Sequence, residues 1–175
     1  MSGRRALFLD RDGTLIVDVG YPSEPARVEL IAGAAEALRS MSRDWLLVVI
    51  SNQSGIGRGL VTPEQATAVH DRFVAAFAEA GVAFAAFYYC PHAPEANCAC
   101  RKPAPGMLLD AAEELGIDLA SSIVIGDKAS DVEAGRAAGV GHAIRFGPDV
   151  DGASADARCD EWEEVKQAVK AVRSG

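Results

Sequence analysis

Apolar and polar positions recur along the chain with two different periods, which predict both strands and helices. Five short apolar runs have the length of buried strands, at residues 6–9, 45–50, 83–89, 123–125 and 143–146. Apolar residues at helical spacing predict helices at about residues 33–41, 62–81, 105–115, 130–139 and 162–172. Strands that alternate with helices are typical of βαβ units, so the pattern predicts an α/β fold with a parallel sheet.

The ends of these elements carry recognisable local signals. Thr62 with Gln65, and Ser130 with Glu133, have the spacing of capping boxes that begin helices. Glycine-rich or proline-rich stretches at residues 16–25 and 51–59 predict loops, and a polar stretch at 151–157 predicts another. The first two loops follow the first and second strands, at the sheet edge where open α/β folds bind ligands.

Two carboxylates directly follow the first strand, in the run Phe8 to Leu15 (FLDRDGTL). Gly13 permits a sharp turn there, so Asp10 and Asp12 can face one site. Mg²⁺ prefers a few carboxylates with water and substrate phosphate, and a carboxylate can also attack phosphorus. The same Asp-Arg-Asp-Gly run is also typical of a surface turn, and this local pattern alone does not separate the two interpretations.

Three cysteines and a histidine lie within eleven residues: Cys90, His92, Cys98 and Cys100. This set matches the four ligands of a closed, structural zinc site. The alternatives are unrelated thiols or a disulfide, and a disulfide is not expected in a cytoplasmic chain. We expect a zinc-binding loop at residues 90–102 that holds Lys102 in place.

Composition limits the partners. The chain has 175 residues, 49% of them hydrophobic and 24% charged, as expected for one globular domain spanning residues 1–175. The formal net charge is −8, which disfavours nucleic acid as a partner but allows a small phosphorylated substrate. No apolar run approaches membrane-spanning length, and Asp10 interrupts the first apolar run too early for a signal peptide. We therefore expect a cytoplasmic protein without membrane or nucleic-acid partners, and a monomer.

Four motifs together resemble the haloacid dehalogenase superfamily. They are the Asp-x-Asp-Gly-Thr run that begins at Asp10, then residues 48–52 (VVISN), 101–103 (RKP) and 125–131 (IGDKASD). The resemblance covers nearly the whole chain and implies a Rossmann-like, doubly wound, mainly parallel sheet. The second carboxylate, Asp12, is similar to that of the phosphatases of this superfamily. The two places where members insert a cap domain are too short here, which implies a capless, open active site.

The resemblance also implies roles for the acidic residues. Asp10 is the expected nucleophile, and Asp12 is the expected general acid and base. Asp127, Asp10 and the backbone carbonyl of Asp12 are the expected Mg²⁺ ligands. Asp131 is either a further ligand, through water, or an acid that stabilises the first turn of a helix.

Basic and polar residues complete the expected phosphate site. The Ser51 hydroxyl and the Asn52 backbone amide are expected to donate to phosphate oxygens. Lys102 is expected to contact both the phosphoryl group and Asp10, and Lys128 lies beside Asp127.

The zinc loop narrows the resemblance to one branch of the superfamily. The Cys-x-His…Cys-x-Cys pattern followed by RKPAPGM is similar to the histidinol-phosphate and D-glycero-D-manno-heptose 1,7-bisphosphate phosphatases. The run Asp18, Val19, Gly20 and Tyr21 resembles the heptose enzymes, although Val19 stands where they usually have histidine. Substrate contacts are then implied at Asp18, Val19, Gly20, Tyr21, Ser51, Asn52, Gln53, Ser54, Arg101, Lys102 and Lys128.

The expected activity is Mg²⁺-dependent removal of the 7-phosphate from the heptose bisphosphate, with histidinol phosphate as the alternative substrate. A bisphosphate needs a second cationic contact, for which Arg101 and Arg58 are the candidates. A third hypothesis is a zinc-stabilised binding module without activity. The intact set Asp10, Asp12, Ser51, Lys102 and Asp127 argues against it.

Overall fold

The computed structural model describes residues 3–173. Six strands form one sheet: β1 (Ala6–Leu9), β2 (Leu46–Asn52), β3 (Ala86–Cys90), β4 (Ile123–Gly126), β5 (His142–Phe146) and β6 (Ala157–Cys159). The helices are α1 (Ala34–Met41), α2 (Ser54–Gly57), α3 (Pro63–Glu79), α4 (Gly106–Leu115), α5 (Ala129–Ala138) and α6 (Trp162–Arg173). Three short 3₁₀ helices lie in connections, at η1 (Pro25–Arg27), η2 (Pro94–Ala96) and η3 (Leu119–Ser121).

The sheet has the strand order β3-β2-β1-β4-β5-β6, and every neighbouring pair is parallel. The chain builds the sheet outward from β1 in one direction and then outward from β4 in the other. The direction therefore changes between β1 and β4, whose registered pairs include Leu9 with Ile125. In open α/β sheets, ligands bind beyond the carboxyl ends of the strands at such a switch point.

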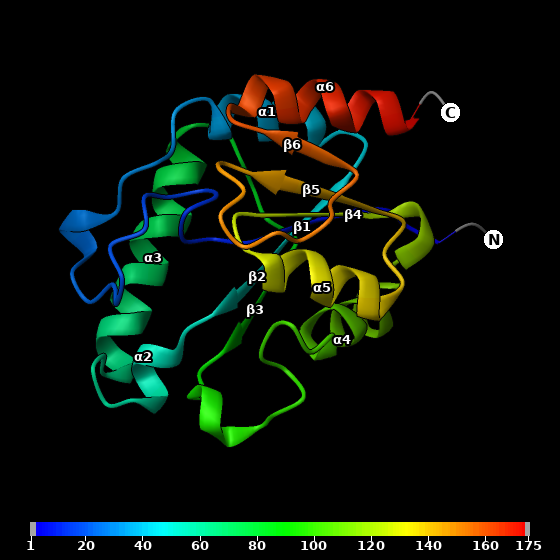
Figure 1. The fold of residues 1–175 in the computed structure, drawn as a ribbon. Coiled ribbons are helices and arrows are strands. Elements are labelled where there is room, and N and C mark those ends of the chain that lie inside the picture. The colour runs from blue at the N-terminus through cyan, green and yellow to red at the C-terminus, as the bar shows by residue number, and fades with distance from the viewer. Residues whose placement is uncertain (1–2, 174–175) are drawn as a thin grey trace.

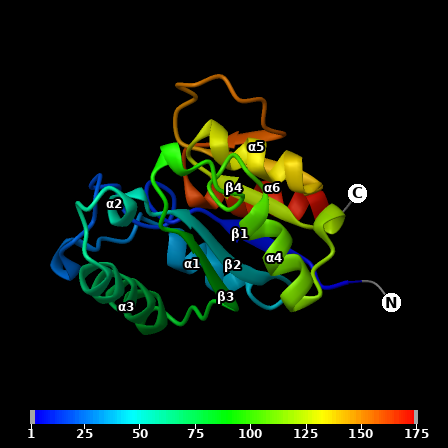
Figure 2. The same ribbon diagram turned by 90° about the horizontal axis from the view of Figure 1, so that it is seen from below.

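Helices cover both faces of the sheet, which confirms the predicted doubly wound architecture. Alternate residues of β1 serve the two sides: Leu7 and Leu9 belong to one core cluster, and Ala6 and Phe8 to the other. The first cluster contains residues of α1, α3 and α6, and the second contains residues of α4 and α5. Figure 1 shows α1 and α6 above the sheet and α4 and α5 below it. In the view from below, α4 and α5 lie in front of the strands (Figure 2).

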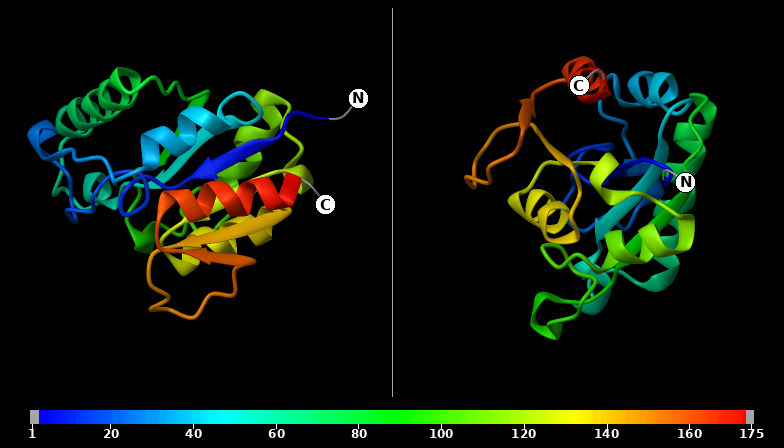
Figure 3. Two further views of the ribbon diagram at one scale, coloured as in Figure 1. Left: turned by 90° about the horizontal axis from the view of Figure 1, so that it is seen from above. Right: turned by 90° about the vertical axis from the view of Figure 1, so that its right-hand side faces the viewer.

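The C-terminal helix is tied to the loop that follows β1. Trp162, at the start of α6, is 1% exposed, and its indole Nε1 donates to the Thr14 carbonyl at 2.9 Å. From above, α6 and α1 lie side by side on the same face of the sheet (Figure 3). The hydrogen bond from Trp162 to Thr14 supports the loop after β1 from this face.

Three local predictions need correction. Strand β6 begins at Ala157, the last residue of the stretch expected to be a loop. The sequence did not indicate this strand, because Ala157-Arg158-Cys159 contains no apolar run and pairs only at the sheet edge. The loop after β2 contains the one-turn helix α2. The capping box expected at Ser130 is wrong: α5 begins at Ala129, and Asp131 accepts a hydrogen bond from the Lys128 amide at 3.0 Å. The capping box of Thr62 and Gln65 is confirmed.

Candidate active site

The predicted motifs meet at one cavity of about 530 Å³ beyond the carboxyl ends of β1, β2 and β4. Its wall includes Asp10 and Asp12 from the loop after β1, and Lys128 from the loop after β4. The remaining lining comes from residues 18, 20–22, 52–56, 61, 101–103, 130 and 131. The cavity therefore lies at the switch point between β1 and β4, as the strand order predicts.

At the centre of the site, the Lys102 ammonium joins two buried carboxylates. Its Nζ lies 2.8 Å from Asp10 Oδ1 and 2.6 Å from Asp131 Oδ1, and it also donates to the Ile50 carbonyl at 2.9 Å. Lys102 is 3% exposed. Burial alone would raise the pKa of Asp10, but Lys102 and the neighbouring hydrogen bonds outweigh it and lower that pKa. Asp10 is thus held as a carboxylate, the form that a nucleophile requires.

Three carboxylates, of Asp10, Asp127 and Asp131, offer oxygens within 4.8 Å of one another. Burial, followed by the charge of Asp10, raises the pKa of Asp127 to about 8. Such a crowded set of oxygen ligands has more negative charge than Lys102 balances, and it fits a divalent cation such as Mg²⁺. Thr14, fully buried, points its hydroxyl at this group, 3.4 Å from Asp10 Oδ2 and 3.5 Å from Asp127 Oδ1.

The position of Asp131 fits both roles considered for it, and its side chain makes a third kind of contact. It accepts the Lys128 amide at the start of α5, as an acid in the first turn does, and it lies in the carboxylate cluster. In addition, it is 2% exposed and pairs directly with Lys102, which the sequence did not indicate. Burial and the nearby Asp10 charge raise its pKa. Its close approach depends on Gly126, since a Cβ there would lie 2.3 Å from the Asp131 carboxylate.

Asp12 is held by side chains from two directions. Gln53 Nε2 donates to Asp12 Oδ2 at 2.8 Å and also contacts Ser51 Oγ at 2.6 Å. Arg11 donates from Nε to the same Oδ2 at 3.1 Å. Gln53, expected to contact substrate, lines the cavity and also links Asp12 with Ser51. Ser51 itself is 1% exposed at the end of β2.

Asn52 has a structural contact that the sequence did not indicate. Its side chain donates to the Lys102 carbonyl and accepts from the Lys102 amide, both at 3.0 Å. These two bonds join the end of β2 to the zinc-loop segment across 50 positions of the chain. They fix the backbone from which the Lys102 side chain reaches Asp10.

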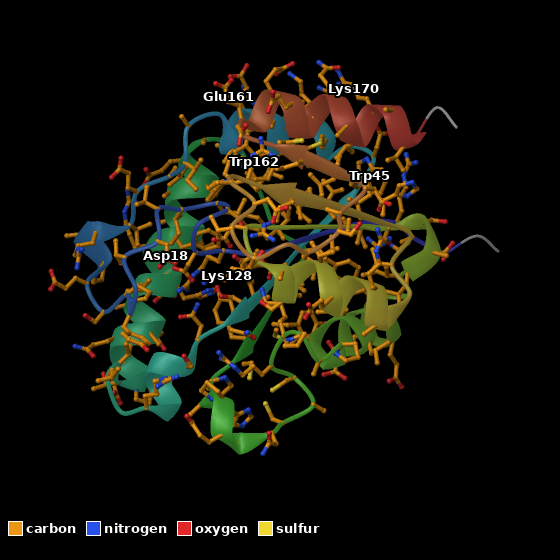
Figure 4. All side chains as sticks on the ribbon, viewed as in Figure 1. Asp18, Trp45, Lys128, Glu161, Trp162 and Lys170 are labelled. Carbon is orange, nitrogen blue, oxygen red and sulfur yellow. The ribbon has the colours of Figure 1, made fainter. Side chains whose placement is uncertain are left out.

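The predicted substrate residues mostly line the outer cavity. Asp18, Gly20, Tyr21, Ser54, Arg101 and Lys128 are among them, and Val19 and Arg58 are not. Asp18 and Lys128 lie side by side in Figure 4, with Oδ2 and Nζ 3.8 Å apart. Arg101 Nη1 is buried and has no hydrogen-bond partner within residues 3–173, which suits an incoming anion.

The predicted zinc ligands come together. The sulfur atoms of Cys90, Cys98 and Cys100 and a ring nitrogen of His92 lie within 4.8 Å of one another. The shortest sulfur pair, Cys100 with Cys90, is 3.1 Å apart, and all four cysteines of the chain are free thiols. Four convergent soft ligands fit a tetrahedral Zn²⁺. The loop packs on α2, because Gly57 donates to the Pro91 carbonyl at 2.8 Å.

Comparison with known proteins agrees with this geometry. The HAD-hydrolase-like family model matches residues 99–144. The D-glycero-β-D-manno-heptose-1,7-bisphosphate 7-phosphatase of Yersinia pestis is 40% identical over 179 residues, which cover 95% of each chain. The enzyme of the same name from Escherichia coli strain K12 is 44% identical over 144 residues, covering 78% of this chain and 75% of that one.

A crystal structure of D,D-heptose 1,7-bisphosphate phosphatase from B. bronchiseptica, complexed with magnesium and phosphate, superposes with a TM-score of 0.84. It is 29% identical and covers 98% of this chain and 99% of its own. No helix among residues 3–173 is long and apolar enough to cross a membrane. The chain therefore belongs to the haloacid dehalogenase superfamily and, within it, to the family of D-glycero-β-D-manno-heptose 1,7-bisphosphate 7-phosphatases.

Proposed function

We propose that this chain hydrolyses the 7-phosphate of D-glycero-D-manno-heptose 1,7-bisphosphate through an aspartyl-phosphate on Asp10. The observation that carries the proposal is the pair formed by buried Asp10 and Lys102 at the floor of the cavity. The relatives named for this activity, at 40–44% identity, support the choice of substrate.

The proposed reaction has two displacement steps. The Asp10 carboxylate attacks phosphorus, the bond between phosphorus and the sugar oxygen breaks, and Asp12 gives its proton to that oxygen. Water then attacks the aspartyl-phosphate and loses a proton to Asp12, which releases inorganic phosphate and restores Asp10. Lys102 and Ser51 hold the phosphoryl oxygens, and the Gln53 side chain keeps Asp12 beside them.

Mg²⁺ would be held by Asp10, Asp127 and the backbone carbonyl of Asp12, where it would offset the negative charge of the phosphate. Burial and the neighbouring Asp10 charge raise the pKa of Asp127, so a cation held beside it would favour its carboxylate form. We also propose one structural Zn²⁺ on Cys90, His92, Cys98 and Cys100, which would hold the segment before Lys102.

Asp10→Asn tests the mechanism. The variant should fold and bind phosphate but show no turnover, because an amide is not an anionic nucleophile. Asp110→Asn, which changes an exposed carboxylate on α4, is the matched control and should retain activity. Turnover by a clean Asp10→Asn preparation would contradict the proposed chemistry.

Substrate choice is tested by comparing the heptose bisphosphate with histidinol phosphate. The second phosphate of the bisphosphate suits Arg101, whose Nη1 has no hydrogen-bond partner among the described residues, whereas histidinol phosphate carries a cationic amine. Arg101→Ala should lower kcat/KM for the bisphosphate by about one to two decades, from the loss of about 1.5–3 kcal/mol. Arg58→Ala, an exposed arginine outside the cavity, is the control. Equal or faster hydrolysis of histidinol phosphate by the unmodified protein would favour that alternative.

A further inference from the structure

Arg11 is a buried cation that the proposed reaction does not use. It is 2% exposed and is absent from the lining of the cavity. Its guanidinium nevertheless contacts Asp12, with Nε 3.1 Å from Oδ2 and Nη2 3.4 Å from Oδ1. Burying a guanidinium is costly unless it is paired, and the Asp12 carboxylate provides that pair.

The loop after β1 does not need this side chain for its own shape. The amides of Leu15 and Ile16 donate to the Arg11 backbone carbonyl at 2.9 and 3.1 Å. Backbone contacts of this kind are available to any residue with the same conformation. The side chain of Arg11 therefore has a separate function from the turn.

Behind Arg11 lies an aromatic support built from two other elements. The Arg11 guanidinium carbon is 5.3 Å from the ring centroid of Tyr89, on β3, a cation–π distance. The Tyr89 hydroxyl and His70 Nδ1, on α3, are hydrogen-bonded at 2.8 Å. The His70 ring also packs edge-on against Phe87, with centroids 4.7 Å apart. Arg11 is thus supported by α3 and β3.

The contacts with Asp12 are unequal. Gln53 Nε2 and Arg11 Nε both donate to Oδ2, whereas Oδ1 has, among residues 3–173, only the longer contact to Arg11 Nη2. Oδ1 is therefore the oxygen with free capacity to carry the transferred proton. We infer that Arg11, supported by Tyr89 and His70, is a positioning residue that orients Asp12 so that Oδ1 serves the leaving group. This inference rests on the proposed function, in which Asp12 is the general acid.

The leaving group provides a readout that a merely structural role would not change. A sugar alkoxide needs a proton to depart, whereas the phenolate of p-nitrophenyl phosphate departs without one at neutral pH. Misplacing Asp12 should therefore slow phosphoenzyme formation from the heptose bisphosphate more than from p-nitrophenyl phosphate. Rapid-quench measurement of the aspartyl-phosphate isolates this step from its hydrolysis.

Arg11→Lys keeps the charge but loses the fork that reaches both oxygens. The measured ratio is the rate of phosphoenzyme formation from the heptose bisphosphate divided by the rate from p-nitrophenyl phosphate. Arg11→Lys should lower this ratio by about ten- to a hundredfold, within the range of general acid catalysis. Tyr89→Phe keeps the ring and removes the hydroxyl, and it should lower the ratio by about two- to tenfold. Arg5→Met is the matched control. The Arg5 guanidinium carbon lies 4.4 Å from the ring centroid of Trp45, and Arg5 does not line the cavity. Its ratio should equal that of the unmodified protein.

Asp12→Asn separates the two levels of the argument. If it slows both substrates equally, the proposed role of Asp12 is wrong, and the inference about Arg11 is overturned with it. If Asp12→Asn lowers the ratio while Arg11→Lys and Tyr89→Phe leave it unchanged, only the inference is overturned. Should Arg11→Lys fail to fold, Tyr89→Phe decides the question alone, because it preserves the buried ring.

Discussion

Replacing Lys102 by methionine tests the electrostatic design of the cavity floor. The variant keeps most of the buried side-chain volume but removes the ammonium that lies 2.8 Å from Asp10 and 2.6 Å from Asp131. Breaking a buried ion pair by removing one partner typically costs about 3–5 kcal/mol, because the remaining charge is left unpaired. For a chain of this size, that loss corresponds to a fall in Tm of roughly 6–20 °C.

Mg²⁺ should partly reverse this loss. Without the lysine, Asp10, Asp127 and Asp131 form a more negative cluster, so a divalent cation should stabilise the variant more than the unmodified protein. Thermal melts with and without Mg²⁺ measure both effects. The matched control is Lys128→Met, which removes an exposed lysine of the same cavity whose ion pair with Asp18 spans 3.8 Å. An exposed pair of this kind contributes about 0–1 kcal/mol.

Two results would refute this reasoning. If Lys102→Met melts at the temperature of Lys128→Met, the buried pairs contribute little to stability. If Mg²⁺ raises the Tm of Lys102→Met no more than it raises the Tm of the unmodified protein, the three carboxylates do not act as one charged cluster.

Two further predictions concern the metals. Protein purified without added metal should contain one zinc per chain by elemental analysis, and Cys98→Ser should lose it and melt at a lower temperature, while Cys159→Ser, outside the cluster, should retain the zinc. The pKa of Asp127 is raised from its usual 3.8 to about 8. The proton on Asp127 therefore stabilises the folded protein fully below about pH 3.8, and this stabilisation is lost as the pH rises through about 8. Mg²⁺ bound by Asp127 would displace that proton, so the apparent Mg²⁺ affinity should rise up to about pH 8 and then level off. A calorimetric titration that finds no proton release on Mg²⁺ addition at neutral pH would contradict this prediction.

The sheet was predictable from sequence because buried parallel strands are continuous apolar runs. β1, β2 and β4 match the predicted runs to within two residues at each end. β6 was not predictable, because its three residues include an exposed arginine and pair only at the edge. The four-residue helix α2 was equally hidden, since its glycines favour a loop interpretation.

The site was predictable as a set of residue types, and less so as a set of contacts. Motifs at strand ends brought Asp10, Asp12, Ser51 and Asp127 to one edge. The pair of Lys102 with Asp131 and the bonds of Asn52 to Lys102 join segments 29 and 50 positions apart, so tertiary packing decides them. The contact of Arg11 with Asp12 depends on the Arg11 rotamer, and contacts from β3 and α3 select that rotamer.

The two hydrogen bonds between the Asn52 side chain and the backbone of Lys102 have a consequence for how new specificities could evolve in this family. They fix the backbone at residue 102 whatever side chain precedes it, while the Arg101 side chain extends into the outer cavity. A mutation at position 101 can therefore change the charge presented to a substrate without displacing Lys102 from Asp10. Adjacent residues thus differ sharply in evolutionary freedom, and related enzymes could diverge toward anionic or cationic substrates through single substitutions that leave the chemistry unchanged.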